Sequence, residues 1–266
     1  MSPLLSRVLV AIVGLPVILG VVWLGGWWLF ALLAAAAIVG LHEYTQMTRA
    51  LRPVVLAGYL GVLAMLLGAS RGGVAWLLGG FMLALAITFV LHLVAETRQP
   101  PTVAIGATVL GVAWIGFGLA HIALLRDTEE GRLAVFTVLI AVFAADTFAY
   151  FGGRLLGRHK LAPTMSPGKT WEGFVAGTIA AVAVAFFALY EDRATYVTIW
   201  EALVLGAVVA VAAALGDLFE SALKRDMQVK DTGRLLGGHG GVLDRVDSLL
   251  WAAPAAFYLL LAYGHA

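Results

Sequence analysis

Two segments of the chain, residues 146–172 and 217–247, hold most of the side chains that could do chemistry. Asp244 and Asp247 are spaced i and i+3, so a helix would place both carboxylates on one face. The face of a preceding helix that carries Asp217 would also carry Glu220, Ser221 and Lys224. Carboxylates at neighbouring helix ends are the oxygen ligands that a hard divalent cation takes. The pattern predicts Mg²⁺, which keeps several waters, takes few carboxylates and binds substrate phosphates.

A glycine-rich stretch joins these two acidic helix ends. Backbone amides can approach an anion closely at its glycines, which are Gly233, Gly237, Gly238, Gly240 and Gly241. The bases that would balance the charge of an anion are Lys224, Arg225, Lys230 and Arg245. Asp231 is a further candidate ligand, and His239 would either donate to a phosphate or brace the loop. The alternative is a solvated loop in which aspartates cap helices and glycines form turns, but the combination in one short segment favours a site.

The first segment contains Ser166-Pro167-Gly168-Lys169-Thr170 immediately before an apolar stretch. Its composition is similar to that of a phosphate-binding loop, but the G-x-x-x-x-G-K-[ST] spacing and a preceding strand are missing, so a Walker site is rejected. Lys169 and Thr170 would still lie near the amino end of a helix, where free N–H groups and the helix dipole favour phosphate. We therefore expect both residues to contact a phosphorylated substrate.

The elements that position these segments must lie in a membrane. Hydrophobic residues make up 62% of the 266 residues and charged residues 12%, with a mean hydropathy of +0.96. Too few charged side chains remain to cover a soluble globule, and there is too much apolar surface for disorder. The net charge of +1 argues against a nucleic-acid partner, which needs a basic footprint. The absence of cysteine excludes disulfides, a thiolate nucleophile and cysteine-bound zinc.

Nine stretches are long and apolar enough to cross the ~30 Å hydrocarbon core of a bilayer as helices. We expect them at residues 5–25, 27–47, 53–69, 73–95, 103–125, 133–152, 172–190, 198–219 and 246–263. Helix breakers separate successive stretches, as at Arg52-Pro53, Arg71-Gly72-Gly73 and Gln99-Pro100-Pro101. The predicted fold class is therefore all-α, a polytopic integral membrane helical bundle with about nine transmembrane helices.

The distribution of basic residues predicts how this bundle is oriented. With the N-terminus inside, most of the 17 Lys and Arg residues fall on the inner side. Because positively charged loops stay in the cytoplasm, we expect a cytoplasmic N-terminus and cytoplasmic loops at 153–171 and 220–245. We expect residues 1–130 to provide scaffold, lipid access and dimer contacts, and residues 131–266 to form the catalytic region.

The second segment contains the pattern Ser221-x-x-Lys224-Arg225-x4-Lys230-Asp231-x-Gly233 through His239-Gly240-Gly241-x-x-Asp244-Arg245-x-Asp247. This pattern closely resembles the signature of phosphatidate cytidylyltransferases, also called CDP-diglyceride synthetases. The Asp146-Thr147 segment and Ser166-Pro167 to Gly173 are similar to a second conserved region of that family, whereas the N-terminal half matches only in character. Three residues depart from the family pattern, namely Gly237 for a common Pro, Gly168 for a frequent Lys and Phe148 for a small residue.

The resemblance implies transfer of a cytidylyl group from CTP to phosphatidate, giving CDP-diacylglycerol and pyrophosphate. It implies catalytic roles for Asp217, Lys224, Asp231, Asp244 and Asp247, with the four aspartates holding one or two Mg²⁺ ions and a monovalent cation as a further option. It implies substrate binding by Asp146, Lys160, Ser166, Lys169, Thr170, Ser221, Arg225, Lys230, His239, Gly240, Gly241 and Arg245. The implied partners are CTP, phosphatidate and membrane lipid, for a homodimer in a bacterial inner membrane with its active site facing the cytoplasm.

Two alternatives stay open at this point. A related CTP-dependent polyprenol or lipid kinase would use the same nucleotide and metal with an alcohol acceptor, and would release CDP. A transporter or channel would use the acids as a cation or proton path, but these acids cluster at one membrane face rather than at the midplane. Neither H-E-x-x-H nor G-x-S-x-G is present, which excludes zincin and ordinary serine-hydrolase chemistry.

Overall fold

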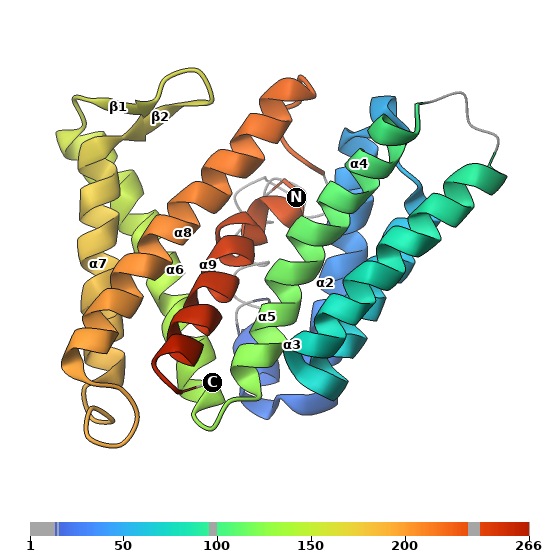
Figure 1. Ribbon diagram of the computed structural model, residues 1–266. Helices are drawn as coiled ribbons and strands as arrows, with labels where there is room; N and C mark the ends of the chain where they lie inside the picture. The colour runs from blue at the N-terminus through green and yellow to red at the C-terminus, as the bar shows by residue number, and fades with distance from the viewer. Residues whose placement is uncertain (1–13, 15, 96–99, 234–239, 266) are drawn as a thin grey trace. The chain divides into compact units, whose positions relative to one another are not determined.

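The computed structural model describes residue 14 and residues 16–95, 100–233 and 240–265. These residues form two compact units, whose elements Figure 1 traces along the chain. Unit 1 takes its residues from Met1–Leu124 and Met227–Val246, and unit 2 from Leu125–Asp226 and Asp247–Ala266. The first boundary between the units lies between Leu124 and Leu125, and the functional division predicted at residue 130 stays a prediction.

Unit 1 contains three long spans and a short connecting helix among its described residues. They are α2 (Gly26–Met47), the 3₁₀ helix η1 (Arg49–Leu51), α3 (Val55–Val94), and a span made of α4 (Pro101–Gly111), the π-helical turn η2 (Val112–Gly116) and α5 (Phe117–Arg126). Pro101 starts the last span at a position where a missing N–H costs nothing. Tyr44 joins α2 to that span, because its buried hydroxyl donates to the Ala107 carbonyl at 2.7 Å.

Helix α3 is a hairpin of two helical arms. Its 40 residues would extend ~60 Å if straight, about twice the thickness of the hydrocarbon core. Gly72 and Gly73 interrupt the helical geometry, and Gly73 has a φ of 66°, which glycine adopts without a Cβ clash. A Cβ at Gly80 would lie 2.7 Å from the Ala64 carbonyl oxygen, so the arms approach through their backbones. The predicted helix break at residues 71–73 is confirmed.

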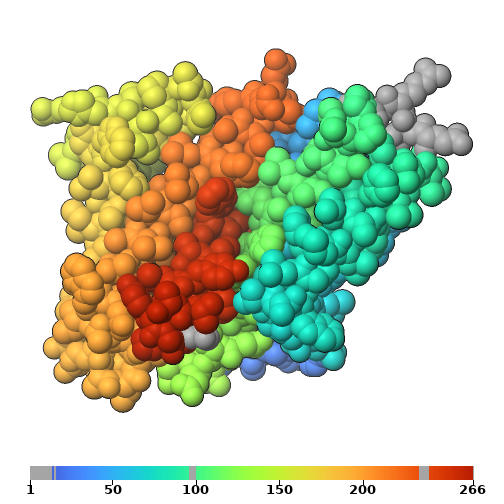
Figure 2. Space-filling view, viewed as in Figure 1, coloured from blue at the N-terminus to red at the C-terminus, as the bar shows by residue number. Residues whose placement is uncertain are grey.

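Unit 2 contains the remaining helices and a small sheet. Its elements are α6 (Gly131–Leu156), β1 (Lys160–Ala162), β2 (Ser166–Thr170), α7 (Trp171–Leu189), α8 (Ile199–Asp226) and the part of α9 (Leu243–Ala262) from Asp247 onward. Helix α7 packs between α6 and α8, and Figure 2 shows the side chains of α7 and α8 in contact along one face. A Cβ at Gly173 or Gly177 would lie 2.5 Å from a carbonyl oxygen of α6, so small residues set this close packing.

The predicted all-α membrane class is confirmed. Within the described ranges, seven helices are long and apolar enough to cross a membrane, and one of them, α3, corresponds to two predicted stretches. The predicted stretch 5–25 lies largely outside the described residues, although 16–24 is helical, so the count of nine is not confirmed. Large apolar side chains lie on the surface, as expected for contact with lipid; Phe187 is 75% and Trp200 71% exposed.

The antiparallel hairpin β1–β2, between α6 and α7 in Figure 1, was not predicted. Lys160 pairs with Thr170, and Ala162 pairs with Ser166. Pro167 and the neighbouring glycine disfavour a strand on propensity alone, so local sequence did not indicate this element. The Ser166–Thr170 motif is itself a strand, whereas a Walker motif is a loop that follows one.

Candidate active site

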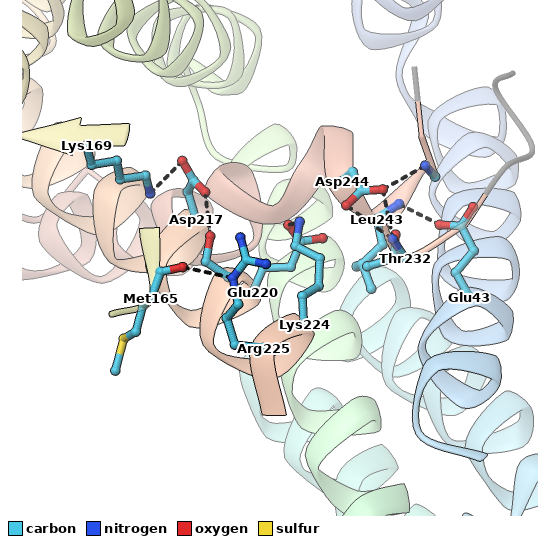
Figure 3. Close-up of polar contacts among 12 residues, drawn as sticks. Glu43, Met165, Lys169, Asp217, Glu220, Lys224, Arg225, Thr232, Leu243 and Asp244 are labelled. Carbon is cyan, nitrogen blue, oxygen red and sulfur yellow. Dashed lines mark hydrogen bonds and ion pairs between the residues drawn. The ribbon is translucent and has the colours of Figure 1, made fainter. Parts of the chain in front are cut away.

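Four carboxylates gather in unit 2, and we call them the acidic cluster: Asp146 of α6, Asp217 and Glu220 of α8, and Asp247 of α9. Asp217 interacts electrostatically with both Asp146 and Asp247, and Asp247 also lies near Glu220. Like charges this close repel each other unless positive charge compensates them. Lys169 supplies one such charge, because its Nζ lies 2.6 Å from Asp217 Oδ2 (Figure 3).

Lys169 is aimed at the acidic cluster by the hairpin and the start of α7. The Thr170 hydroxyl accepts a hydrogen bond from the Gly173 amide at 3.1 Å and so caps α7. Glu172 accepts from His159 Nδ1 at 2.6 Å, which joins the first turn of α7 to the residue before β1. Thr170, which was predicted to bind substrate, therefore also has a local structural role.

Helix α8 presents its polar residues on one face, with the spacing expected from the sequence. Lys224 Nζ lies 2.6 Å from Glu220 Oε2, and these side chains are 14% and 1% exposed. Ser221 Oγ donates to Asp217 Oδ1 at 3.4 Å. Glu220 was placed on this face by its spacing but was not among the predicted site residues, because nothing local showed that it would be buried against Asp247.

Gly216 explains why α8 and α9 come close enough for Asp217 and Asp247 to interact. A Cβ at Gly216 would lie 2.5 Å from the Asp247 carbonyl oxygen and 3.1 Å from the Trp251 ring. Only a glycine allows two helix backbones to approach this closely. Ser248, buried at the next position of α9, interacts with Asp146, so α6 approaches the same place.

The donor chemistry of the acidic cluster fits a hard cation. In the part of the chain that the structure describes, no group of three or more His, Asp or Glu side chains is already arranged around a metal position. All four carboxylates are nevertheless oxygen donors, and Lys169 and Lys224 pair with only two of them. A divalent cation would balance the remaining charge. The residues therefore fit Mg²⁺ by charge and donor type, and binding would require their side chains to converge.

In unit 1, two carboxylates hold the backbone beside the glycine-rich stretch. Asp244 accepts hydrogen bonds from the amides of Gly241 at 2.8 Å and Thr232 at 3.1 Å. Glu43 of α2 accepts from the next two amides along the chain, at 3.0 and 2.8 Å (Figure 3). We call this set the loop anchor; it comprises Glu43, Thr232, Gly241, Val242, Leu243 and Asp244. Asp244, predicted as a metal ligand, here binds backbone amides.

Other predicted site residues lie outside these two groups. Lys160, Arg225, Lys230, Asp231 and Arg245 are exposed, and Ser166 is half-buried in β2. The exposed Arg225 still has a contact, since its Nε donates to the Met165 carbonyl at 3.3 Å. Gly240 has a φ of 79°, which favours glycine at that turn. His239, Gly237 and Gly238 fall outside the described residues.

Comparison with known proteins matches nearly the whole chain. A family model described as "Cytidylyltransferase family" covers residues 5–263. The phosphatidate cytidylyltransferase of Haemophilus influenzae is 35% identical over 282 residues, which cover 95% of this chain and 97% of the relative. That of Staphylococcus haemolyticus is 31% identical, covering 96% and 98%. That of Brucella abortus is 36% identical, covering 97% and 93%. The similarity therefore includes the N-terminal helices, which the motifs did not reach.

Proposed function

The chain belongs to the cytidylyltransferase family, and from that premise we propose that it transfers the cytidylyl group of CTP to phosphatidate. The products are CDP-diacylglycerol and pyrophosphate. The observation that supports this most directly is the pairing of Lys169 with Asp217 inside the acidic cluster. A site for a nucleoside triphosphate needs cation-binding carboxylates and basic side chains next to each other, and unit 2 provides both.

The reaction needs little covalent help from the protein. A phosphate oxygen of phosphatidate attacks the α-phosphorus of CTP, a new P–O bond forms, and the bond to the β-phosphate breaks to release pyrophosphate. The attacking oxygen is already ionised, so no general base is required. Positioning of the two phosphates and neutralisation of their charge supply the acceleration. We assign charge neutralisation to Lys169 and Lys224 of unit 2, and Lys230 and Arg245 stay candidates from the sequence alone.

Mg²⁺ is the cation that we propose for the acidic cluster. Asp217, Asp247 and Asp146 would hold it. When bound, the ion would stabilise the negative charge of the triphosphate oxygens. Asp231 and Asp244 stay candidate ligands from the sequence alone. The family supports metal dependence in general, and the choice of Mg²⁺ follows from the preference of that ion for few carboxylates together with phosphate oxygens.

The helices and the bacterial relatives support an integral membrane protein. We propose further that it lies in a bacterial inner membrane with the acidic cluster at the cytoplasmic face, because CTP is a cytoplasmic metabolite and the basic residues favour that orientation. A homodimer is proposed from the family resemblance.

Product identification tests the function. Detergent-purified protein is incubated with labelled CTP, phosphatidate and Mg²⁺, and the products are separated. We expect a CDP-lipid and pyrophosphate in equal amounts. Formation of CDP and a phosphorylated alcohol from an added polyprenol would instead identify a kinase. Absence of any nucleotide turnover in folded protein would contradict both assignments.

Substitution of Asp217 tests the site. Asp217→Asn keeps the size of the side chain but removes the charge that Lys169 and the cation share, so turnover should fall by about a hundredfold or more. Asp226→Asn is the matched control, because Asp226 is an exposed acid at the end of the same helix. Equal activity of the two variants would remove Asp217 from the site.

A further inference from the structure

Glu43 is a buried acid that the proposed chemistry does not use, with only 5% of its surface exposed. Its carboxylate oxygens accept hydrogen bonds from the Val242 and Leu243 amides, at 3.0 and 2.8 Å. These amides lie at the start of α9, where N–H groups have no partner inside the helix. A carboxylate satisfies them and interacts favourably with the positive end of the helix dipole. Glu43 therefore caps α9 from α2.

The glycines around Glu43 are required for this contact. A Cβ at Gly233 or at Gly241 would overlap the Glu43 carboxylate, closer than real Cβ atoms come. At Gly241 the same Cβ would also lie 2.6 Å from the Thr232 hydroxyl. A larger residue at either position would displace Glu43 from the amides that it binds. Two glycines that were predicted to admit an anion thus also admit the Glu43 side chain.

Asp244 completes the arrangement. It binds the amides of Thr232 and Gly241, so the two carboxylates of the loop anchor occupy four backbone amides. The backbone on both sides of residues 233–240 is therefore tied to helices of unit 1. Each oxygen of Glu43 accepts one amide hydrogen bond, so its place in the structure is to hold the backbone at the start of α9.

We propose that Glu43 is a positioning residue, which holds the backbone at Val242 and Leu243, next to the Thr232 and Gly241 amides that Asp244 binds, so that the neighbouring bases can take part in nucleotide binding. Those bases, Lys230 and Arg245, lie just outside the anchored positions on either side. The inference rests on the proposed function. Loss of the Glu43 carboxylate deprives the part-buried Val242 amide and the buried Leu243 amide of their acceptor, which loosens the start of α9. The consequence is weaker use of the nucleotide, with little effect on use of the lipid.

Glu43→Gln tests this inference, with His42→Ala as the matched control. Gln presents one acceptor oxygen and a donor NH₂ where two amides need acceptors, whereas His42 is exposed and its hydrogen bond goes to Tyr59. In Glu43→Gln we expect faster hydrogen exchange at the Val242 and Leu243 amides. The KM for CTP should rise roughly tenfold, the equivalent of one charged hydrogen bond, while the KM for phosphatidate stays unchanged. His42→Ala should match the wild type in all three measurements.

Conservative and loop-side variants separate positioning from general stability. Glu43→Asp keeps the charge with a shorter reach, so it should recover part of the CTP affinity lost in Glu43→Gln. In Gly233→Ala the added methyl group would overlap the Glu43 carboxylate, so the KM for CTP should also rise. This variant keeps the test available if Glu43→Gln does not fold.

Three results would overturn the inference: unchanged exchange at Val242 and Leu243, faster exchange with an unchanged KM for CTP, or equal rises in the KM values for CTP and phosphatidate. Failure of the proposed function is a separate result. In that case the wild type itself would not convert CTP and phosphatidate, while the exchange measurement would still report whether Glu43 holds the loop.

Discussion

At the scale of single residues, the chemistry of unit 2 depends on charge balance. Asp217 lies 2.6 Å from Lys169 and interacts with two further carboxylates. Glu220 and Lys224 form a second pair that is almost fully buried. Two ammonium groups therefore face four carboxylates, and the excess of acid is what a cation-dependent phosphate site needs.

Lys169→Ala should affect CTP more than phosphatidate. The substitution removes a positive charge next to Asp217 that the triphosphate would otherwise meet, so the KM for CTP should rise about tenfold. Steady-state kinetics with each substrate varied in turn measure the difference. Arg158→Ala, at an exposed base two residues before β1, serves as the control. An unchanged KM for CTP in Lys169→Ala would exclude this lysine from nucleotide binding.

Removal of divalent metal should abolish turnover. The acidic cluster has more carboxylates than bases, so without a cation it repels the triphosphate instead of binding it. We expect EDTA to stop product formation and added Mg²⁺ to restore it. Thermal unfolding followed in the same samples shows whether the protein stays folded. Full activity in EDTA would contradict the assignment of a metal site to these residues.

At the scale of helices, glycine positions decide which functional residues become neighbours. Gly216 allows α9 to approach α8 at Asp217, and Gly173 and Gly177 allow α7 to approach α6. Asp146 follows directly after Ala145, whose carbonyl oxygen faces Gly177. Close backbone packing in the membrane-spanning part of unit 2 therefore determines where one member of the acidic cluster lies.

Gly177→Ala should destabilise unit 2 although alanine is the better helix former. In an open helix position the exchange gains about 0.5–1 kcal/mol, but overpacking against a backbone oxygen costs about 1–3 kcal/mol. A Cβ at Gly177 would lie 2.5 Å from the Ala145 carbonyl oxygen, so the overpacking term should win. A lower Tm in detergent and reduced turnover are expected. The control is Gly106→Ala, where a Cβ meets nothing within 4 Å and the Tm should not fall.

At the scale of the whole molecule, the orientation of the helices determines which side of the membrane each loop faces. The chain contains no cysteine, so a single introduced cysteine can be labelled without background. Gly168→Cys lies in the hairpin between α6 and α7, and Glu129→Cys lies in the loop before α6. Both positions are exposed.

The basic residues predict opposite labelling of these two positions. In right-side-out vesicles, a membrane-impermeant thiol reagent should label Glu129→Cys, and it should label Gly168→Cys only after permeabilisation. Inverted vesicles should give the reverse pattern and serve as the internal control. Labelling of Gly168→Cys in intact right-side-out vesicles would mean that the predicted orientation is wrong.

Local sequence was sufficient to predict the helices and the polar face of α8. Hydropathy placed most bounds of the helices from α2 to α9 within about four residues, because crossing a bilayer demands about 20 apolar residues wherever they occur. The exception is α8, which continues to Asp226 beyond its predicted end at residue 219 because its last turns are polar. The spacing of Asp217, Glu220 and Lys224 was sufficient to align them, since a helix repeats every 3.6 residues. The hairpin β1–β2 was missed because Pro and Gly in β2 hide its strand character.

Hydropathy and the two motifs were enough to identify a membrane-spanning helical enzyme of this family, with its acids and bases in two short segments. That Glu43 caps α9 becomes apparent only in the folded chain, since its partners lie 199 and 200 residues away and no periodicity links them. The tertiary structure also decided that Asp146, Asp217 and Asp247 become neighbours. The physical reason is that hydropathy and spacing act within one helix, whereas contacts between helices depend on how closely their backbones can pack.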